Sequence, residues 1–403
     1  MANTWVLSAL WVGLALLATL LAIWFRMSTA LSEIVVGTVA QLVIGAAFGR
    51  GGLLGNTEWI TFLAGTGAIV LTFLAGAELD PAMFRRKWRE SLVIGLAGFF
   101  GPFLGCTLIA HFVLHWGIMA SWLCGVALST TSVAVVYAVM LELGFNTTEY
   151  GKAILAACFV NDLGTVLALG LIFSPFTIKT LVFVGVSIVT FAVLPFLTPW
   201  FFKKYGGRVS ELEAKYILFM LFALGGLALW AGSEPVLPAY IIGMVLAGTM
   251  GKDHALVRRL RTLTFGFLTP FYFIRAGSFV SVPALLAAPT VLLVLFSAKM
   301  LTKIVSVFPA VRLHKYEGAS GVYYTLMMST GLTFGTISAL FGLNHKIISQ
   351  AQYSFIVGTV IASAVIPTVI ANMFFLPRHL LPRRDDERAS ATIPDQTVGA
   401  GAI

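Results

Sequence analysis

Residues 151–173 read GKAILAACFVNDLGTVLALGLIF, an apolar run with a single carboxylate, Asp162, at its centre. A helix needs about 20 apolar residues to cross a bilayer about 30 Å thick, and this run is that long. An ionisable side chain at such depth costs roughly 3 kcal/mol or more and marks a functional site by default. The stretch therefore predicts a membrane-spanning helix that carries a functional acid. The alternative is a structural role for Asp162, held in place by a lysine.

The composition of the whole chain agrees with a membrane location. Of its 403 residues, 59% are hydrophobic and only 11% are charged, whereas soluble domains average about 25% charged residues. So little polar surface excludes a soluble enzyme and a disordered protein. The net charge of +9 does not indicate a nucleic-acid binder, because excess Lys and Arg in a membrane protein belongs to cytoplasmic loops and anionic lipid head groups.

Thirteen apolar runs of helical character follow one another, which predicts an all-α polytopic membrane protein. They cover residues 5–24, 31–49, 58–78, 91–114, 117–141, 151–173, 177–201, 215–233, 236–250, 256–281, 284–308, 318–341 and 347–375. Most of the 26 Lys and Arg residues fall in alternate loops, which predicts an outside N-terminus and a cytoplasmic C-terminus. Residues 376–403 are expected to form a short, disordered cytoplasmic tail.

The chain shows internal similarity at an offset of about 200 residues, which is typical of the inverted repeats of secondary transporters. The matches occur in the same order in both halves: Gly37 with Gly243, Ala75-Gly76 with Ala276-Gly277, and Ser129-Thr130 with Ser329-Thr330. This pairing leaves the run 177–201 as a linker between the two repeats.

Two equivalent runs of the repeats are expected to break near the membrane midplane. One contains Ser129, Thr130, Thr131 and Ser132, and the other contains Ser329, Thr330, Gly331 and Thr333. Consecutive hydroxyl side chains compete with helical hydrogen bonds, and glycine loosens a helix further. Broken helices would offer free carbonyls to a cation. The alternative is that these small residues only permit tight helix packing.

Two lysines in the run 284–308 are candidates for a buried counter-charge. Lys299 and Lys303 are four residues apart, which places them on one face of a helix. Lys303 is nearer the helix end, where a lysine is able to snorkel towards the lipid head groups, so central depth favours Lys299.

These residues together resemble the monovalent cation:proton antiporters of the bacterial Na+/H+ exchanger superfamily. The most specific element is Asn161-Asp162 after a hydroxyl-rich helix; Leu74–Asp80, Pro270–Phe273 before Ala276-Gly277, the mid-helix base and the Ser-Thr-Gly break support it. The sequence mixes two patterns of that family. The Asn-Asp pair resembles electroneutral members, whereas the lysine resembles the electrogenic branch, so stoichiometry stays open.

The resemblance implies an antiporter fold with two crossed broken helices, within a membrane domain of residues 1–375. Core helices at about 91–173 and 284–375 would slide, elevator-like, against a homodimeric scaffold at about 5–78 and 215–281. Asp162 would bind the transported monovalent cation, with Asn161, Thr130, Thr131 and Ser132 beside it. Lys299 or Lys303 would be the helix base, and Ser329, Thr330, Gly331 and Thr333 would form the second break.

The implied activity is exchange of Na+, or Li+ or K+, for H+ in a bacterial inner membrane, with lipids and a second copy of the chain as partners. No cofactor, nucleic acid or enzymatic activity is expected. The alternative is a sodium-coupled symporter of an organic anion on a similar scaffold. That activity would need a roomy polar cavity with paired sodium sites, which a lone buried acid does not favour. The sequence leaves the preferred cation and the pH set-point open.

Overall fold

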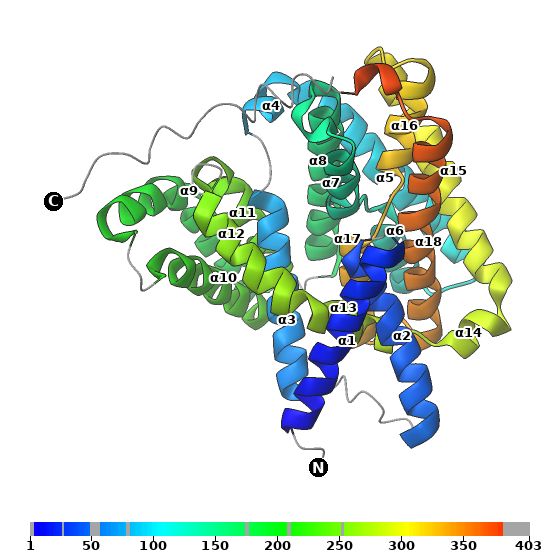
Figure 1. The fold of residues 1–403 in the computed structure, drawn as a ribbon, viewed down its shortest axis with the longest axis horizontal. Helices are drawn as coiled ribbons and strands as arrows, with labels where there is room; N and C mark the ends of the chain where they lie inside the picture. The colour runs from blue at the N-terminus through cyan, green and yellow to red at the C-terminus, as the bar shows by residue number, and fades with distance from the viewer. Residues whose placement is uncertain are drawn as a thin grey trace.

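The protein folds into a bundle of helices in a computed structural model, which describes residues 4–25, 28–48, 57–77, 81–173, 177–207, 211–250 and 254–381. Within these ranges all regular secondary structure is helical, and Figure 1 shows the long helices packed side by side. Ten described helical stretches are long and apolar enough to cross a membrane, with the interrupted stretch Gly318–Asn344 counted as one, and two shorter apolar helices accompany them. The predicted class, an all-α membrane protein, is confirmed.

Every predicted apolar run is occupied by helix in the part of the chain that is described. The first half contains α1 Thr4–Phe25, α2 Thr29–Phe48, α3 Glu58–Ala77, α4 Pro81–Arg86, α5 Trp88–Phe112, α6 Ile118–Ser129, α7 Val133–Glu142, a 3-10 turn at Phe145–Thr147 and α8 Glu149–Phe173. The second half contains α9 Ile178–Tyr205, α10 Leu212–Trp230, α11 Val236–Met250, α12 His254–Leu263, a π-helix at Thr264–Leu268, α13 Thr269–Ser278, α14 Val282–Ala287, α15 Pro289–Leu313, α16 Gly318–Met328, α17 Thr333–Asn344, α18 Gln350–Phe374 and a 3-10 turn at Arg378–Leu380.

Four of the predicted runs are divided rather than continuous. The runs 117–141 and 318–341 are interrupted where hydroxyl residues were expected to break them, between α6 and α7 and between α16 and α17. In the run 256–281, the backbone N–H of Thr269 donates to the carbonyl of Thr264, five residues earlier. This π-turn forms directly before Pro270, which has no N–H to continue the α-helical pattern. In the run 284–308, Pro289 starts a new helix. The number of membrane crossings stays a prediction, as does the orientation of the termini.

Helices of equal length recur at equivalent positions in the two halves of the chain. Helices α5 and α15 each have 25 residues, and so do α8 and α18. The turns before the two broken helices also correspond, because His115 and Lys315 both have left-handed backbones, with φ of 54° and 66°. These pairs lie about 200 residues apart, the offset that the sequence matches indicated. The opposite orientation of the two halves stays a prediction.

Four glycines of the sequence repeat hold two pairs of helices in close contact. In each case a backbone carbonyl of the facing helix occupies the place of the missing Cβ: Ile274 at Gly37, Ile34 at Gly277, Tyr240 at Gly76 and Phe73 at Gly243. The first two contacts join α2 to α13, and the last two join α3 to α11. Exchanging the two repeats converts one helix pair into the other, so equivalent glycines make equivalent contacts.

This packing predicts that alanine substitution affects stability differently at two glycines of α11. Gly243→Ala is expected to lower the stability of the protein by about 1–3 kcal/mol, because the added methyl would overlap the α3 backbone. Gly248 has no atom within 4 Å of its Cβ position, so Gly248→Ala should leave stability unchanged or slightly raise it. Melting temperatures of both purified variants in one detergent would test this. Equal melting temperatures would show that the α3–α11 contact tolerates a side chain.

The described helices pack in two groups, and α9 contacts helices of the second group. In one group α5 packs on α6, α8 and α15, while α18 packs on α15, α16 and α17. In the other group α2 packs on α13, α3 packs on α11, and α1 and α10 pack on these pairs. Helix α9 contacts α10 and α11, and Figure 1 shows α9–α12 on the opposite side of the molecule from α15, α16 and α18. The division into scaffold and core that the resemblance implies, and any separate motion of the two, stay predictions.

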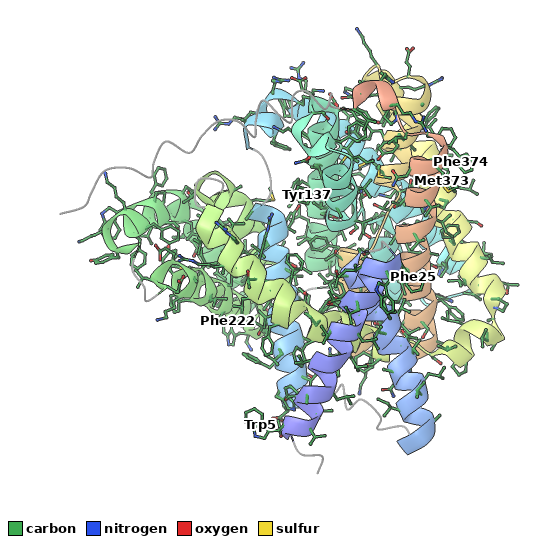
Figure 2. All side chains as sticks on the ribbon, viewed as in Figure 1. Trp5, Phe25, Tyr137, Phe222, Met373 and Phe374 are labelled. Atoms are coloured by element: carbon green, nitrogen blue, oxygen red, sulfur yellow. The ribbon has the colours of Figure 1, made fainter. Side chains whose placement is uncertain are left out.

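Large apolar side chains cover the outside of the bundle. Trp5 and Phe374 are 83% and 71% exposed, and Figure 2 shows both at the periphery. Soluble proteins rarely expose continuous apolar surfaces of this kind, whereas a lipid bilayer accommodates them. The exposed apolar surface therefore supports the membrane assignment independently of helix length.

Candidate ion-binding site

The two helix interruptions meet inside the protein. The backbone N–H of Ser132 donates to the carbonyl of Thr330 over 3.1 Å, and the hydroxyl of Thr131 donates to the carbonyl of Met328 over 2.7 Å. Helix α6 also packs against α17 (Figure 1). Two helix C-termini and two helix N-termini therefore converge, bringing unpaired carbonyls and N–H groups to one place.

Asp162 of α8 lies at this convergence. Its side chain is 1% exposed, and the backbone N–H of Thr131 donates a hydrogen bond to its carboxylate. The Oδ1 atom is buried and has no hydrogen-bond partner among the described residues. A buried carboxylate oxygen is costly to leave unpaired, so this atom is suited to accept a proton or a cation.

The side chain of Asn161, next to Asp162 in α8, contacts helix α5. Its Nδ2 lies 3.5 Å from the carbonyl of Gly95 on α5, and a Cβ at Gly98 would be 3.2 Å from the same nitrogen. Its Oδ1 is buried without a partner in the described part of the chain. Asn161 therefore contacts α5 through its amide nitrogen, and its carbonyl oxygen remains available.

The two lysines of α15 have different surroundings, although both are 0% exposed. The ammonium of Lys303 donates to the hydroxyl of Thr131 over 2.8 Å and interacts electrostatically with Asp162. The Lys299 Nζ lies against the backbone of Gly331 and has no hydrogen-bond partner within the described ranges. Lys303 is thus the lysine that a shared hydroxyl connects to Asp162, whereas central depth had favoured Lys299.

Most of the other predicted hydroxyl groups bond to their own helix. They are Thr130 to Ala127 at 3.2 Å, Ser329 to Thr325 at 2.8 Å, and Thr330 to Met327 at 2.9 Å. The Ser132 oxygen accepts from the N–H of Val135 at 3.3 Å, and Thr333 is buried at the start of α17. Of the predicted hydroxyl residues, Thr131 is the one whose side chain bridges the two breaks.

Two residues beside the site, Cys158 and Met328, were not predicted. The Cys158 Sγ lies 3.6 Å from the Met328 Sδ, one helical turn before Asp162, so helical spacing could have indicated Cys158. Glu33 lies near the start of the predicted run 31–49 and of α2, yet it is buried, 2% exposed. Burial of Glu33 depends on packing between helices, which no local pattern signals. The predicted motif residues Glu78 and Asp80 lie outside the described residues, as does the tail beyond residue 381.

Comparison with known proteins decides the family. The pattern described as "Sodium/hydrogen exchanger, transmembrane" matches residues 12–376, nearly the whole membrane region. The chain belongs to this exchanger family. The predicted resemblance is confirmed, and the family consists of secondary transporters rather than enzymes.

Individual relatives of the exchanger chain agree with this assignment. It is 27% identical to "Probable Na(+)/H(+) antiporter 3" of Methanocaldococcus jannaschii over 88% of this chain and 95% of the relative. It is 23% identical to "Na(+)/H(+)-K(+) antiporter GerN" of Bacillus cereus over 81% and 87% of the two chains. Other relatives are longer, and the chain spans 58% of one from Bacillus subtilis and 46% of one from Arabidopsis thaliana.

The fold also matches a solved structure. That structure is the sodium proton antiporter MjNhaP1 of Methanocaldococcus jannaschii, with a TM-score of 0.70 over 93% of this chain and 98% of the other. The sequence identity is 17%, so this match concerns the arrangement of the helices.

Proposed function

We propose that this chain exchanges Na+, or Li+ or K+, for H+ by alternating access at Asp162. The observation that carries the proposal is the buried, unpartnered carboxylate oxygen of Asp162, at the meeting of two helix breaks, in a member of the exchanger family. A carboxylate binds either a proton or a monovalent cation, and each displaces the other. One such group is sufficient for exchange if it faces the two sides of the membrane in turn.

The groups beside Asp162 have distinct roles in this proposal. The Asn161 Oδ1 and the carbonyls freed at the two breaks supply neutral oxygens to a partly dehydrated cation. The Lys303 ammonium and the N–H of Thr131 stabilise the carboxylate after the cation leaves. The remaining predicted hydroxyls, those of Thr130, Ser132, Ser329, Thr330 and Thr333, maintain the shape of the breaks, and Gly331 leaves room for Lys299.

Alternating access is proposed to arise from movement between the two helix groups. Helices α5–α8 and α15–α18 carry the whole site and would move as one core, elevator-like, against α1–α3 and α10–α13. The scaffold would also hold a second copy of the chain in a homodimer. The protein would lie in a bacterial inner membrane among its lipids, with the N-terminus outside and the C-terminus cytoplasmic. The relatives are named as antiporters, so the symport alternative is not favoured.

Transport by the purified protein in proteoliposomes tests the proposed exchange. Imposing a gradient of Na+, Li+ or K+ across vesicles with a trapped pH-sensitive dye should move protons in the opposite direction for at least one cation. Protein-free vesicles treated with the same gradients are the control. Proton movement driven by none of the three cations would contradict the proposed function.

A further inference from the structure

A cavity of about 540 Å³ lies at the boundary between the two helix groups, away from Asp162. Residues of α3, α10 and α13 line it together with residues of α17. Phe222, which lines it from α10, is labelled in Figure 2. The first three helices belong to the proposed scaffold and α17 belongs to the proposed core. Movement of one group against the other would therefore change the shape of this cavity.

One acidic side chain lines the cavity. Glu234 lies in the short segment between α10 and α11 and is the only acid among the described lining residues. It forms no ion pair with another described residue. The Tyr272 hydroxyl is buried without a hydrogen-bond partner in the described structure, and Asn344 adds an amide oxygen to the lining. Carboxylate, hydroxyl and amide oxygens are the ligands that hard monovalent cations prefer.

The cavity leads towards the ion site along α17. Its lining extends from His345, directly after this helix, back to Ile337 within it, and α17 begins at Thr333, directly after the second break. Four residues of helix correspond to about 6 Å. The lining residue Ile337 therefore lies about one helical turn from the break beside Asp162.

We propose that Glu234 and this cavity form an entry site that recruits monovalent cations from the outer side of the membrane. The inference rests on the proposed exchange and on the proposed orientation of the chain. Such a site has to be weak, since a cation that enters must also leave towards Asp162. The cation of Arg275, whose Cζ lies 5.0 Å from the centre of the Phe279 ring, also lines the cavity and would limit how tightly another cation binds.

The charge of Glu234 should depend on pH in the neutral range. Burial raises the pKa of this loop carboxyl from 4.5 to about 7, so it is charged above that pH and neutral below it. The other titratable or charged side chains of the lining are Tyr272 and Arg275 of α13 and His345 of α17, while α3 and α10 contribute none. Recruitment by Glu234 should therefore operate in an alkaline medium and cease in an acidic one.

The test compares Glu234→Gln with a matched acid on the same side of the membrane. Glu58 is exposed at the start of α3 and does not line the cavity, so Glu58→Gln removes an equal charge elsewhere. Initial exchange rates would be measured against Na+ in right-side-out and in everted vesicles. At pH 8, Glu234→Gln should raise the KM for outer Na+ about three- to tenfold. Its kcat and the KM for cytoplasmic Na+ should stay unchanged.

Three further comparisons complete the test. Glu58→Gln should leave the outer KM unchanged, and Glu234→Asp should restore most of the affinity. At pH 6 the unmodified protein and Glu234→Gln should have the same outer KM. An unchanged outer KM for Glu234→Gln at pH 8, or an equal rise at both faces, would overturn the inference. If the unmodified protein exchanges no monovalent cation for protons, the proposed function fails instead, so the two failures are distinguishable.

Discussion

Asp162→Asn is expected to reduce cation:proton exchange at least about 100-fold, because it removes the carboxylate at the meeting of the two breaks. The asparagine has nearly the same shape and keeps an oxygen to accept from the Thr131 N–H. The helix breaks should therefore remain intact. Removing a buried charge should also leave the melting temperature equal or higher. Exchange in proteoliposomes and thermal unfolding in detergent would measure the two effects.

Glu213→Gln is a suitable control for Asp162→Asn, because Glu213 is another buried acid, 8% exposed, on the scaffold helix α10. Its carboxylate accepts from the N–H of Gly207 over 2.6 Å, far along the chain from the breaks. This variant should keep its exchange rate within about threefold of the unmodified protein. Exchange that survives in Asp162→Asn would place the ion carrier elsewhere. A large fall in melting temperature would instead indicate a structural pair between Asp162 and a lysine.

The second large effect is expected at Lys303. Lys303→Gln removes both the hydrogen bond to Thr131 and the charge that faces Asp162, so exchange should fall about 10- to 100-fold. Lys299→Gln changes a side chain whose nitrogen has no partner among the described residues, and exchange should fall less than about threefold. The same proteoliposome assay measures both variants, and each serves as the control for the other.

The opposite order of the two lysine variants, with exchange falling more in Lys299→Gln than in Lys303→Gln, would make Lys299 the functional base, as its central depth had indicated.

The two lysine variants also test how many protons are exchanged for each cation. Among the described residues, the proposed site holds one carboxyl, that of Asp162 beside Asn161, which favours one-for-one exchange. An imposed membrane potential should then have no effect on the rate. Potential-driven exchange that Lys299→Gln abolishes would identify that lysine as a second proton carrier.

The convergence of helix ends explains why lysines and hydroxyls surround this acid. Helices α6 and α16 end at Ser129 and Met328, and each end directs unpaired carbonyls with partial negative charge into the protein interior. The ammonium of Lys303 offsets this charge, while the Thr131 hydroxyl connects the two breaks. Without these groups, the buried carbonyls and the carboxylate would destabilise one another.

The sequence alone determined the class of fold, the positions of both helix breaks and the acid at their centre. These features depend on local properties that the chain displays directly: the length of apolar runs, consecutive hydroxyl residues, and one carboxylate in an apolar segment. A helix in lipid satisfies its own backbone hydrogen bonds, so each run specifies its element with little help from the rest of the chain. The internal similarity between the two halves is likewise displayed by matched dipeptides in the sequence itself.

Only the tertiary structure decided which side chains meet. Lys299 and Lys303 occupy one face of one helix, and no local pattern separates them. The choice depends on Thr131, 172 positions away along the chain. Likewise, Glu33 and Glu234 resemble ordinary acids at helix ends, and their burial or their place in a cavity follows from how distant helices pack. Contacts between residues far apart in sequence depend on the whole arrangement of the helices, and this arrangement converts a buried acid into a candidate ion site.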